Sequence, residues 1–110
     1  VRVVTMRLDG VAPDALRSMM DTIRDKAPNA VGALIGTNGE KITLAVGVGK
    51  EALARGLKAG ALVKQIAAIA GGNGGGKPDF AMAGIKDAAK VDAALQGAVQ
   101  IVKSELEKNG

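Results

Sequence analysis

Residues 71–78 read Gly-Gly-Asn-Gly-Gly-Gly-Lys-Pro, and the rest of the chain is organised to present them. Five of the first six residues lack a side chain, so the backbone can take positive φ angles and approach a ligand closely. Consecutive N–H groups in a turn can form a concave nest for an anion, and Lys77 adds a positive charge. A flexible linker is the alternative, but these residues lie inside a domain and end in Lys-Pro. They predict an exposed anion-binding loop.

The composition excludes several classes of chemistry. The chain has 110 residues, enough for one domain with a real core, and Phe80 is its only aromatic residue. It contains no His, Cys, Trp or Tyr. A thiol nucleophile, an imidazole base and a Cys/His metal site are therefore excluded, and disulfides cannot stabilise the fold. The lack of cysteine fits a reducing compartment, and we expect the cytoplasm.

The formal net charge of +4 indicates an acidic partner such as nucleic acid. No apolar run approaches the roughly 20 residues of a membrane span, so no membrane partner is expected. The chain begins at Val1 with strand-like residues. We expect residues 1–110 to be one globular domain cut from the C-terminus of a longer protein.

The hydrophobic pattern of the first half predicts three strands and a helix. Apolar and polar residues alternate over residues 2–9, which is typical of a half-buried strand. Leu16 and Met20 belong to a helical pattern that ends near Pro28. Residues 30–36 and 41–48 follow as two strands, and the Asn-Gly pair between them predicts an antiparallel hairpin with positive φ at both residues.

The second half predicts two helices and one strand. Residues 49–56 are expected to be a connection, and residues 57–70 an Ala-rich helix that ends in two glycines. A short strand over residues 79–85 and a helix over residues 90–108 complete the chain. The predicted class is α/β (α+β), with a small mixed sheet of about four strands, including the hairpin, and three helices on one or both faces.

Two nucleotide-binding motifs match only in part. Gly71 and Gly76-Lys77 have the spacing of a phosphate-binding loop, but Pro78 stands where Ser or Thr would bind magnesium, and the segment leaves a helix rather than a strand. Gly47-Val48-Gly49 resembles a dinucleotide fingerprint, but its strand belongs to the predicted hairpin. We therefore reject a nucleotide-triphosphatase site at the glycine run, and we interpret Gly47-Val48-Gly49 as a turn at a strand end.

The carboxylates Asp79, Asp87 and Asp92 cluster in sequence near the glycines. An acid–base pair needs convergent geometry, whereas an Asp near a helix start commonly caps it. We therefore expect structural roles for all three, and no catalytic residue.

The run GGNGGGKPDFAMAG, preceded by LKAGALVKQIA, resembles the DHH-associated domain, in the version that closes alanyl-tRNA synthetase (the C-Ala domain). Lys77 stands where that family has Arg; lysine is a point charge, whereas the planar guanidinium of Arg can make a two-pronged contact. Met82 stands where Gln is common and Ile85 where Gly is common. The positions that match the family pattern are Gly71, Gly72, Gly74, Gly75, Gly76, Pro78, Ala81, Ala83 and Gly84.

The resemblance implies a domain that neither activates alanine nor hydrolyses mischarged tRNA. It implies binding to the outer corner, or elbow, of tRNA, so that the aminoacylation and editing domains share one tRNA. It implies no cofactor in this domain; the parent ligase would use ATP, magnesium and a zinc site elsewhere. With so few aromatic residues, the contacts should be to phosphates and backbone. The candidate RNA-binding residues are Gly71, Gly72, Asn73, Gly74, Gly75, Gly76, Lys77, Phe80, Lys58, Lys64 and Lys86.

Two other functions stay open at this point. The domain could be a homodimerisation module that uses the Ala-rich helix or the C-terminal helix. It could also be the nucleic-acid-binding half of a DHH-family phosphoesterase, although those enzymes carry a Gly-Gly-Gly-His version of the motif and this chain has no His.

Overall fold

The computed structural model describes residues 2–109, except for the side chains of Asn73 and Asn109. The elements are β1 (Arg2–Asp9), α1 (Pro13–Lys26), β2 (Ala30–Asn38), β3 (Lys41–Val48), α2 (Lys50–Ala54), α3 (Ala59–Ile69), β4 (Asn73–Gly76), β5 (Phe80–Ile85), the 3₁₀ helix η1 (Ala88–Lys90) and α4 (Val91–Asn109).

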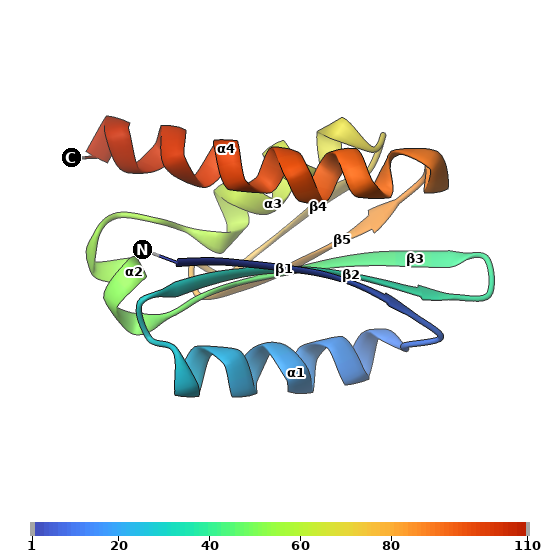
Figure 1. The fold of residues 1–110 in the computed structure, drawn as a ribbon, viewed down its shortest axis with the longest axis horizontal. Coiled ribbons are helices and arrows are strands. Elements are labelled where there is room, and N and C mark those ends of the chain that lie inside the picture. Colours follow the sequence, from blue (N-terminus) through green and yellow to red (C-terminus); the bar gives the residue numbers. More distant parts are fainter. Residues whose placement is uncertain (1, 110) are drawn as a thin grey trace.

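The strands form one mixed sheet in the order β1-β2-β3-β5-β4 (Figure 1). β1 and β2 are parallel and are connected through α1, whereas the other neighbours pair antiparallel. α1 covers one face of the sheet, and α3 and α4 cover the other (Figure 1). The predicted class, a mixed sheet with helices, is confirmed. The two edges of the sheet are β1 and the glycine-rich β4.

Glycines of the sheet face the buried side chains of α1. Its Leu16 and Met20 are fully buried, as the helical spacing predicted. The strands face them with glycines: a Cβ atom on Gly32 would lie 2.7 Å from the Met20 sulfur, and one on Gly36 would lie 2.9 Å from a Leu16 methyl carbon. A Cβ atom at either position would force these side chains to shift, so the glycines of β2 allow Leu16 and Met20 to pack directly on the strand.

The larger core lies between the sheet and the pair α3 and α4. The small side chains of Ala67 and Ala98 are fully buried there, which allows the helices to approach the strands and each other. Leu95 and Leu106 are only partly buried. Ile69 is also only partly buried, whereas Leu62, Val63, Ile66, Val91 and Val102 are fully buried.

The predicted hairpin is confirmed, but its turn differs in detail. Asn38 pairs with Lys41, so the loop consists of Gly39 and Glu40. Gly39 has a φ of 64°, and no described residue other than glycine has a positive φ. Asn38 therefore belongs to the strand. A glycine at the first loop position is the requirement of a type II′ turn, which matches the twist of the strands.

The prediction of a loop over the glycines was wrong. Residues 73–76 form strand β4, and the connection predicted before α3 contains the short helix α2. Only Gly71 of the glycine run has a positive φ, 69°, at the C-terminus of α3. The backbone of β4 is extended, so it does not form the predicted nest of positive-φ residues. The described chain thus has five strands, four α-helices and one 3₁₀ helix instead of about four strands and three helices.

Candidate nucleic-acid interface

The strand β4 pairs closely with β5 because it consists almost entirely of glycine. Its register places Gly74 opposite Ala83 and Gly76 opposite Ala81. A Cβ atom on Gly74 would lie 2.6 Å from the Cα of Ala83, and one on Gly76 would lie 2.7 Å from the Cα of Ala81. Ordinary side chains do not fit at these distances. The close pairing of β4 with β5 therefore requires glycine at both positions.

A groove of about 290 Å³ opens between β4 and the first turns of α3. A Cβ atom on Gly60 of α3 would lie 2.8 Å from the carbonyl oxygen of Gly76. The helix therefore approaches β4 closely because neither residue has a side chain. The groove is lined by Lys58, Gly60, Ala61, Lys64, Gly75, Gly76 and Pro78.

The groove is positively charged. Lys58 and Lys64 line it and are exposed, and the exposed Lys77 directly follows β4. In residues 2–109 none of the three forms an ion pair, and no acidic residue lines the groove. Gly60 and Ala61 belong to the first turn of α3, where backbone N–H groups have no acceptor within the helix. This combination of lysines, helix start and bare backbone suits a phosphate group.

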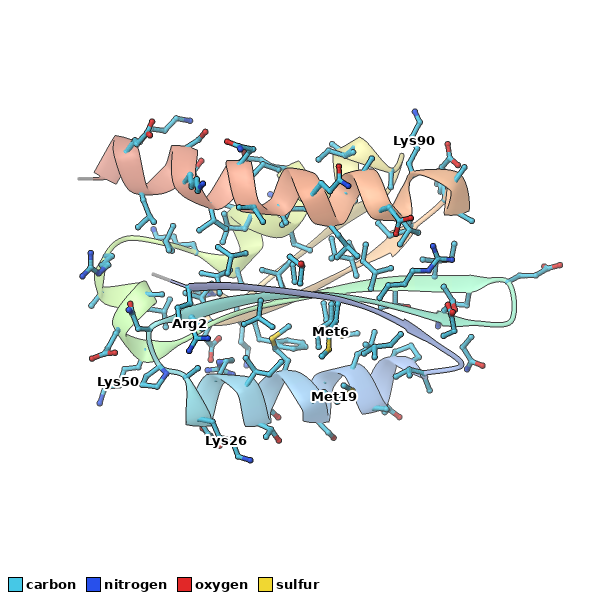
Figure 2. The ribbon with its side chains drawn as sticks, in the orientation of Figure 1. Arg2, Met6, Met19, Lys26, Lys50 and Lys90 are labelled. Carbon is cyan, nitrogen blue, oxygen red and sulfur yellow. The ribbon has the colours of Figure 1, made fainter. Side chains whose placement is uncertain are left out.

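Three other lysines of the chain lie away from the groove. Lys26, Lys50 and Lys90 project outward from α1, α2 and η1 (Figure 2). They are exposed and lie on three separate elements. These three lysines are therefore not part of the charge at the groove.

Several predicted site residues meet at this groove. Lys58, Lys64, Gly75 and Gly76 line it, although Lys58 and Gly76 are far apart in sequence. The sequence analysis missed Gly60, Ala61 and Pro78 as lining residues. A glycine in the first turn of a helix between two lysines was the available signal, because glycine weakens a helix unless close contact requires it.

The remaining predicted residues lie along the same strand or beyond it. Gly71 and Gly72 lead into β4, Gly74 lies within it, and so does Asn73, whose side chain is outside the described part. The Cβ of Lys86 lies 4.0 Å from the position that a Cβ on Gly71 would take. Lys86 therefore lies near the start of the glycine run, whereas Lys77 lies at its end.

Phe80 does not line the groove. It is half-buried on the α1 side of the sheet, whereas its neighbour Ala81 faces α3 and α4. The Arg17 guanidinium carbon lies 5.6 Å from the centre of the Phe80 ring, within cation–π range. The alternation of side chains along β5 separates Phe80 from the lysines. The structure thus does not bring this predicted residue together with the others.

The three carboxylates near the glycines have structural partners, as expected. Asp79 accepts a hydrogen bond of 2.9 Å from Arg24. Asp87 accepts one of 3.0 Å from the Ala89 N–H and caps η1. Asp92 lies 3.6 Å from a guanidinium nitrogen of Arg7. In the described part of the chain, no group of three or more His, Cys, Asp or Glu side chains could hold a metal ion.

The Gly47-Val48-Gly49 motif serves packing. β3 pairs antiparallel on both sides, so it is not the first strand of a dinucleotide fold. A Cβ atom on Gly47 would collide with the Met20 side chain, and one on Gly49 would lie 2.6 Å from the carbonyl carbon of Pro28. The motif does lie at the end of a strand, but the predicted turn is wrong: Gly47 and Val48 belong to β3, and Gly49 has an extended backbone before α2. Among the described helices, none has the length and apolar character that a membrane crossing requires.

A fold of this kind, with a glycine-rich edge strand beside a lysine-bearing helix, has known relatives. The sequence model of the DHHA1 domain matches residues 1–104, so the chain belongs to the DHHA1 domain family. The chain is 46% identical over 107 residues to the alanine–tRNA ligase of Acetivibrio thermocellus, and 45% identical over 104 residues to that of Shouchella clausii. These matches cover 96% and 94% of this chain but only 12% of each ligase.

Solved structures show the same relationship. The C-Ala domain of alanyl-tRNA synthetase from Aquifex aeolicus superimposes with a TM-score of 0.83 at 26% identity. The match covers 91% of this chain and 89% of that domain. The pGpG-specific phosphodiesterase PggH from Vibrio matches with a TM-score of 0.51 at 13% identity over 33% of its length, a likeness of fold alone. The resemblance to the C-Ala domain inferred from the sequence is therefore confirmed.

Proposed function

We propose that this domain is a non-catalytic tRNA-binding module of an alanyl-tRNA synthetase, located at the C-terminus of a longer chain. The similarity to the synthetase C-Ala domain over most of the chain supports this role. The observation that carries the proposal is the groove between β4 and α3, where Lys58 and Lys64 flank a backbone without side chains. Such a surface accepts a sugar–phosphate chain because charge and close approach coincide there.

The contact we propose is with the elbow of tRNA, where the D- and T-loops meet. Proteins that read splayed RNA bases commonly stack them on aromatic rings, but Phe80 packs on the other side of the sheet. The groove offers lysines and backbone amides instead. Recognition by shape and phosphate position suits the elbow, a folded structure that tRNAs share.

The binding of the isolated domain should be weak. Three lysines make few phosphate contacts, so we expect a Kd in the roughly micromolar-or-weaker range of non-specific binding at physiological salt. Attachment to the other domains of a cytoplasmic synthetase would raise the effective concentration at the elbow. The module would thereby help the aminoacylation and editing domains act on one tRNA. It needs no cofactor of its own; ATP, magnesium and zinc belong to other domains.

A protection footprint on a tRNA transcript tests the elbow contact. Hydroxyl-radical cleavage is measured with and without the 110-residue chain at low salt. We expect protection of riboses in the D- and T-loops and none in the anticodon stem. Uniform protection, or protection confined to the acceptor stem, would contradict the elbow assignment.

Homodimerisation is the second candidate, and one observation favours it. β1 is an edge strand of eight residues that pairs with β2 on one side only, and its Met6 is 44% exposed. Unprotected edges of this kind pair readily with another chain. Sedimentation of the chain with and without tRNA separates the two candidates, because a tight dimer that does not bind tRNA would favour dimerisation.

Release of nucleotides from short oligonucleotides in a metal-dependent assay would instead favour the phosphoesterase alternative.

A further inference from the structure

The turn that carries Lys77 is tied to three parts of the protein. The Lys77 N–H donates a hydrogen bond of 3.0 Å to the Phe80 carbonyl, which closes the hairpin of β4 and β5. The Pro78 carbonyl accepts one of 2.7 Å from the Ala59 N–H at the start of α3. The Asp79 carbonyl accepts one of 2.9 Å from the Val48 N–H. The turn is therefore held in place beside the groove.

This turn also carries an acid close to the groove in sequence. Asp79 lies two residues after Lys77 and directly follows Pro78, which lines the groove. Its side chain is 41% exposed. A free carboxylate at this place would repel phosphates and cancel part of the attraction of Lys77.

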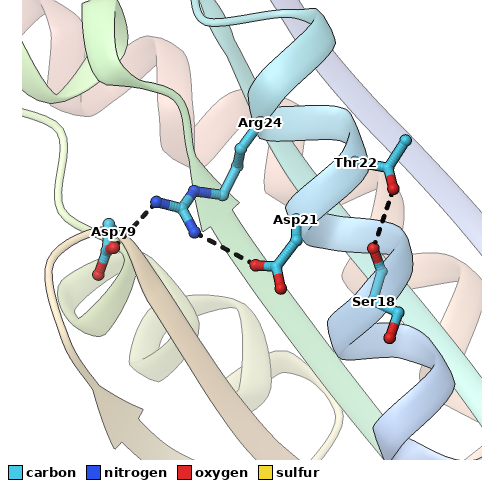
Figure 3. A network of polar contacts seen from close by, with 5 residues as sticks. All are labelled: Ser18, Asp21, Thr22, Arg24 and Asp79. Atoms are coloured by element: carbon cyan, nitrogen blue, oxygen red, sulfur yellow. Dashed lines mark hydrogen bonds and ion pairs between the residues drawn. The ribbon is translucent and has the colours of Figure 1, made fainter.

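Arg24 compensates that charge from the opposite side of the sheet. It extends from the last turn of α1 to Asp79, and its Nη2 lies 2.9 Å from Oδ2 (Figure 3). Its Nη1 lies 3.5 Å from Asp21 of the same helix. Arg24 is 25% exposed, so it is the more buried partner of the pair. A partly exposed ion pair adds little to the stability of the fold. Its effect on the charge of the turn is therefore more important than its effect on stability.

We propose that Arg24 is a positioning residue for RNA binding: it masks the charge of Asp79 and holds that carboxylate toward α1, so that Lys77 is the dominant charge of the turn. This inference rests on the proposed function. It explains why an acid is compatible with a phosphate-binding turn. It also assigns a role in binding to a residue of α1, a helix that does not line the groove.

The test compares tRNA affinity and salt dependence among four variants of the 110-residue chain. Arg24→Met exposes the carboxylate and should weaken binding of a tRNA transcript about threefold beyond the matched control at 0.1 M salt, and more at lower salt. Lys26→Met is that control, because it removes the same charge from an exposed site in the same turn of α1. Asp79→Asn should bind at least as tightly as the unmodified chain.

The double variant Arg24→Met/Asp79→Asn decides between masking and simple anchoring. It lacks the ion pair but also lacks the free carboxylate, so masking predicts that most of the lost affinity returns. A double variant that binds as weakly as Arg24→Met would overturn the inference, because the ion pair would then act only by anchoring the turn. An Arg24→Met variant that binds tRNA as well as Lys26→Met does would also overturn it. If the unmodified chain does not bind tRNA at all, the proposed function fails as well, and circular dichroism melts identify any variant that has unfolded.

Discussion

Gly60 of α3 lies against the carbonyl oxygen of Gly76 in β4, so closely that a Cβ atom on Gly60 would approach this oxygen to 2.8 Å. This contact joins the lysine-bearing helix to the glycine strand, and both residues line the groove. The position of the groove therefore depends on two residues that contribute only backbone.

Gly60→Ala should destabilise the domain although alanine is the better helix former. The helix propensity gained is about 1 kcal/mol, but the methyl group must displace backbone atoms of β4. We expect a net loss of about 1–2 kcal/mol in the free energy of unfolding, measured by urea denaturation. Gly75→Ala is the control: its Cβ would lie 3.7 Å from the Lys64 Cε, an ordinary contact, so stability should change little. Equal losses in the two variants would contradict this packing account.

Gly75→Val and Gly76→Val should separate binding from stability. Gly75 is exposed, and a side chain placed there has room, so Gly75→Val should fold normally. The valine should nevertheless block the close approach of RNA, with at least a several-fold loss of affinity. At Gly76 the Cβ would lie 2.7 Å from the Ala81 Cα, so the loss should be in stability, by more than about 2 kcal/mol. Affinity titrations and thermal melts on both variants check this. A Gly75→Val variant that loses stability and binding alike would indicate a packing role.

Lys77→Arg should strengthen tRNA binding. The family pattern that the sequence resembles has Arg at this position, and the planar guanidinium can bind a phosphate through two parallel hydrogen bonds. Lys77 is exposed and has no ion-pair partner in the described part of the chain, so the longer side chain can be accommodated. We expect about a twofold to fivefold lower Kd by fluorescence anisotropy. Weaker binding would show that the site favours a compact charge.

Phe80→Leu should affect stability but not RNA binding. The ring packs between α1 and the sheet and lies beside Arg17, and it does not line the groove. We expect a loss of about 1 kcal/mol in the free energy of unfolding and an affinity within about twofold of the unmodified chain. A large loss of affinity without a loss of stability would return Phe80 to the binding site.

The sequence predicted the regular elements well where side chains alternate or repeat. β1 and β3 have the predicted bounds because their apolar patterns are strong, and the Asn-Gly pair located the hairpin. It could not predict β4, since glycine has low strand propensity and residues 73–76 become a strand only through pairing with β5. α2 has only five residues, too few for a helical period.

The sequence predicted some residues of the candidate site, but not its shape. Lys58, Lys64 and the glycines were selected from the sequence, yet their common groove results from the packing of α3 beside β4. The contribution of Gly60 and the ion pair between Arg24 and Asp79 connect distant parts of the chain. Tertiary contacts of this kind leave no local pattern in a single sequence.

The salt dependence of tRNA binding tests the central claim most directly. Each lysine that contacts a phosphate contributes about one unit to the slope of log K against log salt concentration. The triple variant Lys58→Ala/Lys64→Ala/Lys77→Ala should therefore reduce this slope by about three, whereas Lys26→Ala/Lys50→Ala/Lys90→Ala, with the same net charge, should leave it nearly unchanged. A slope that falls equally in both triple variants, or in neither, would contradict a phosphate-binding groove between β4 and α3.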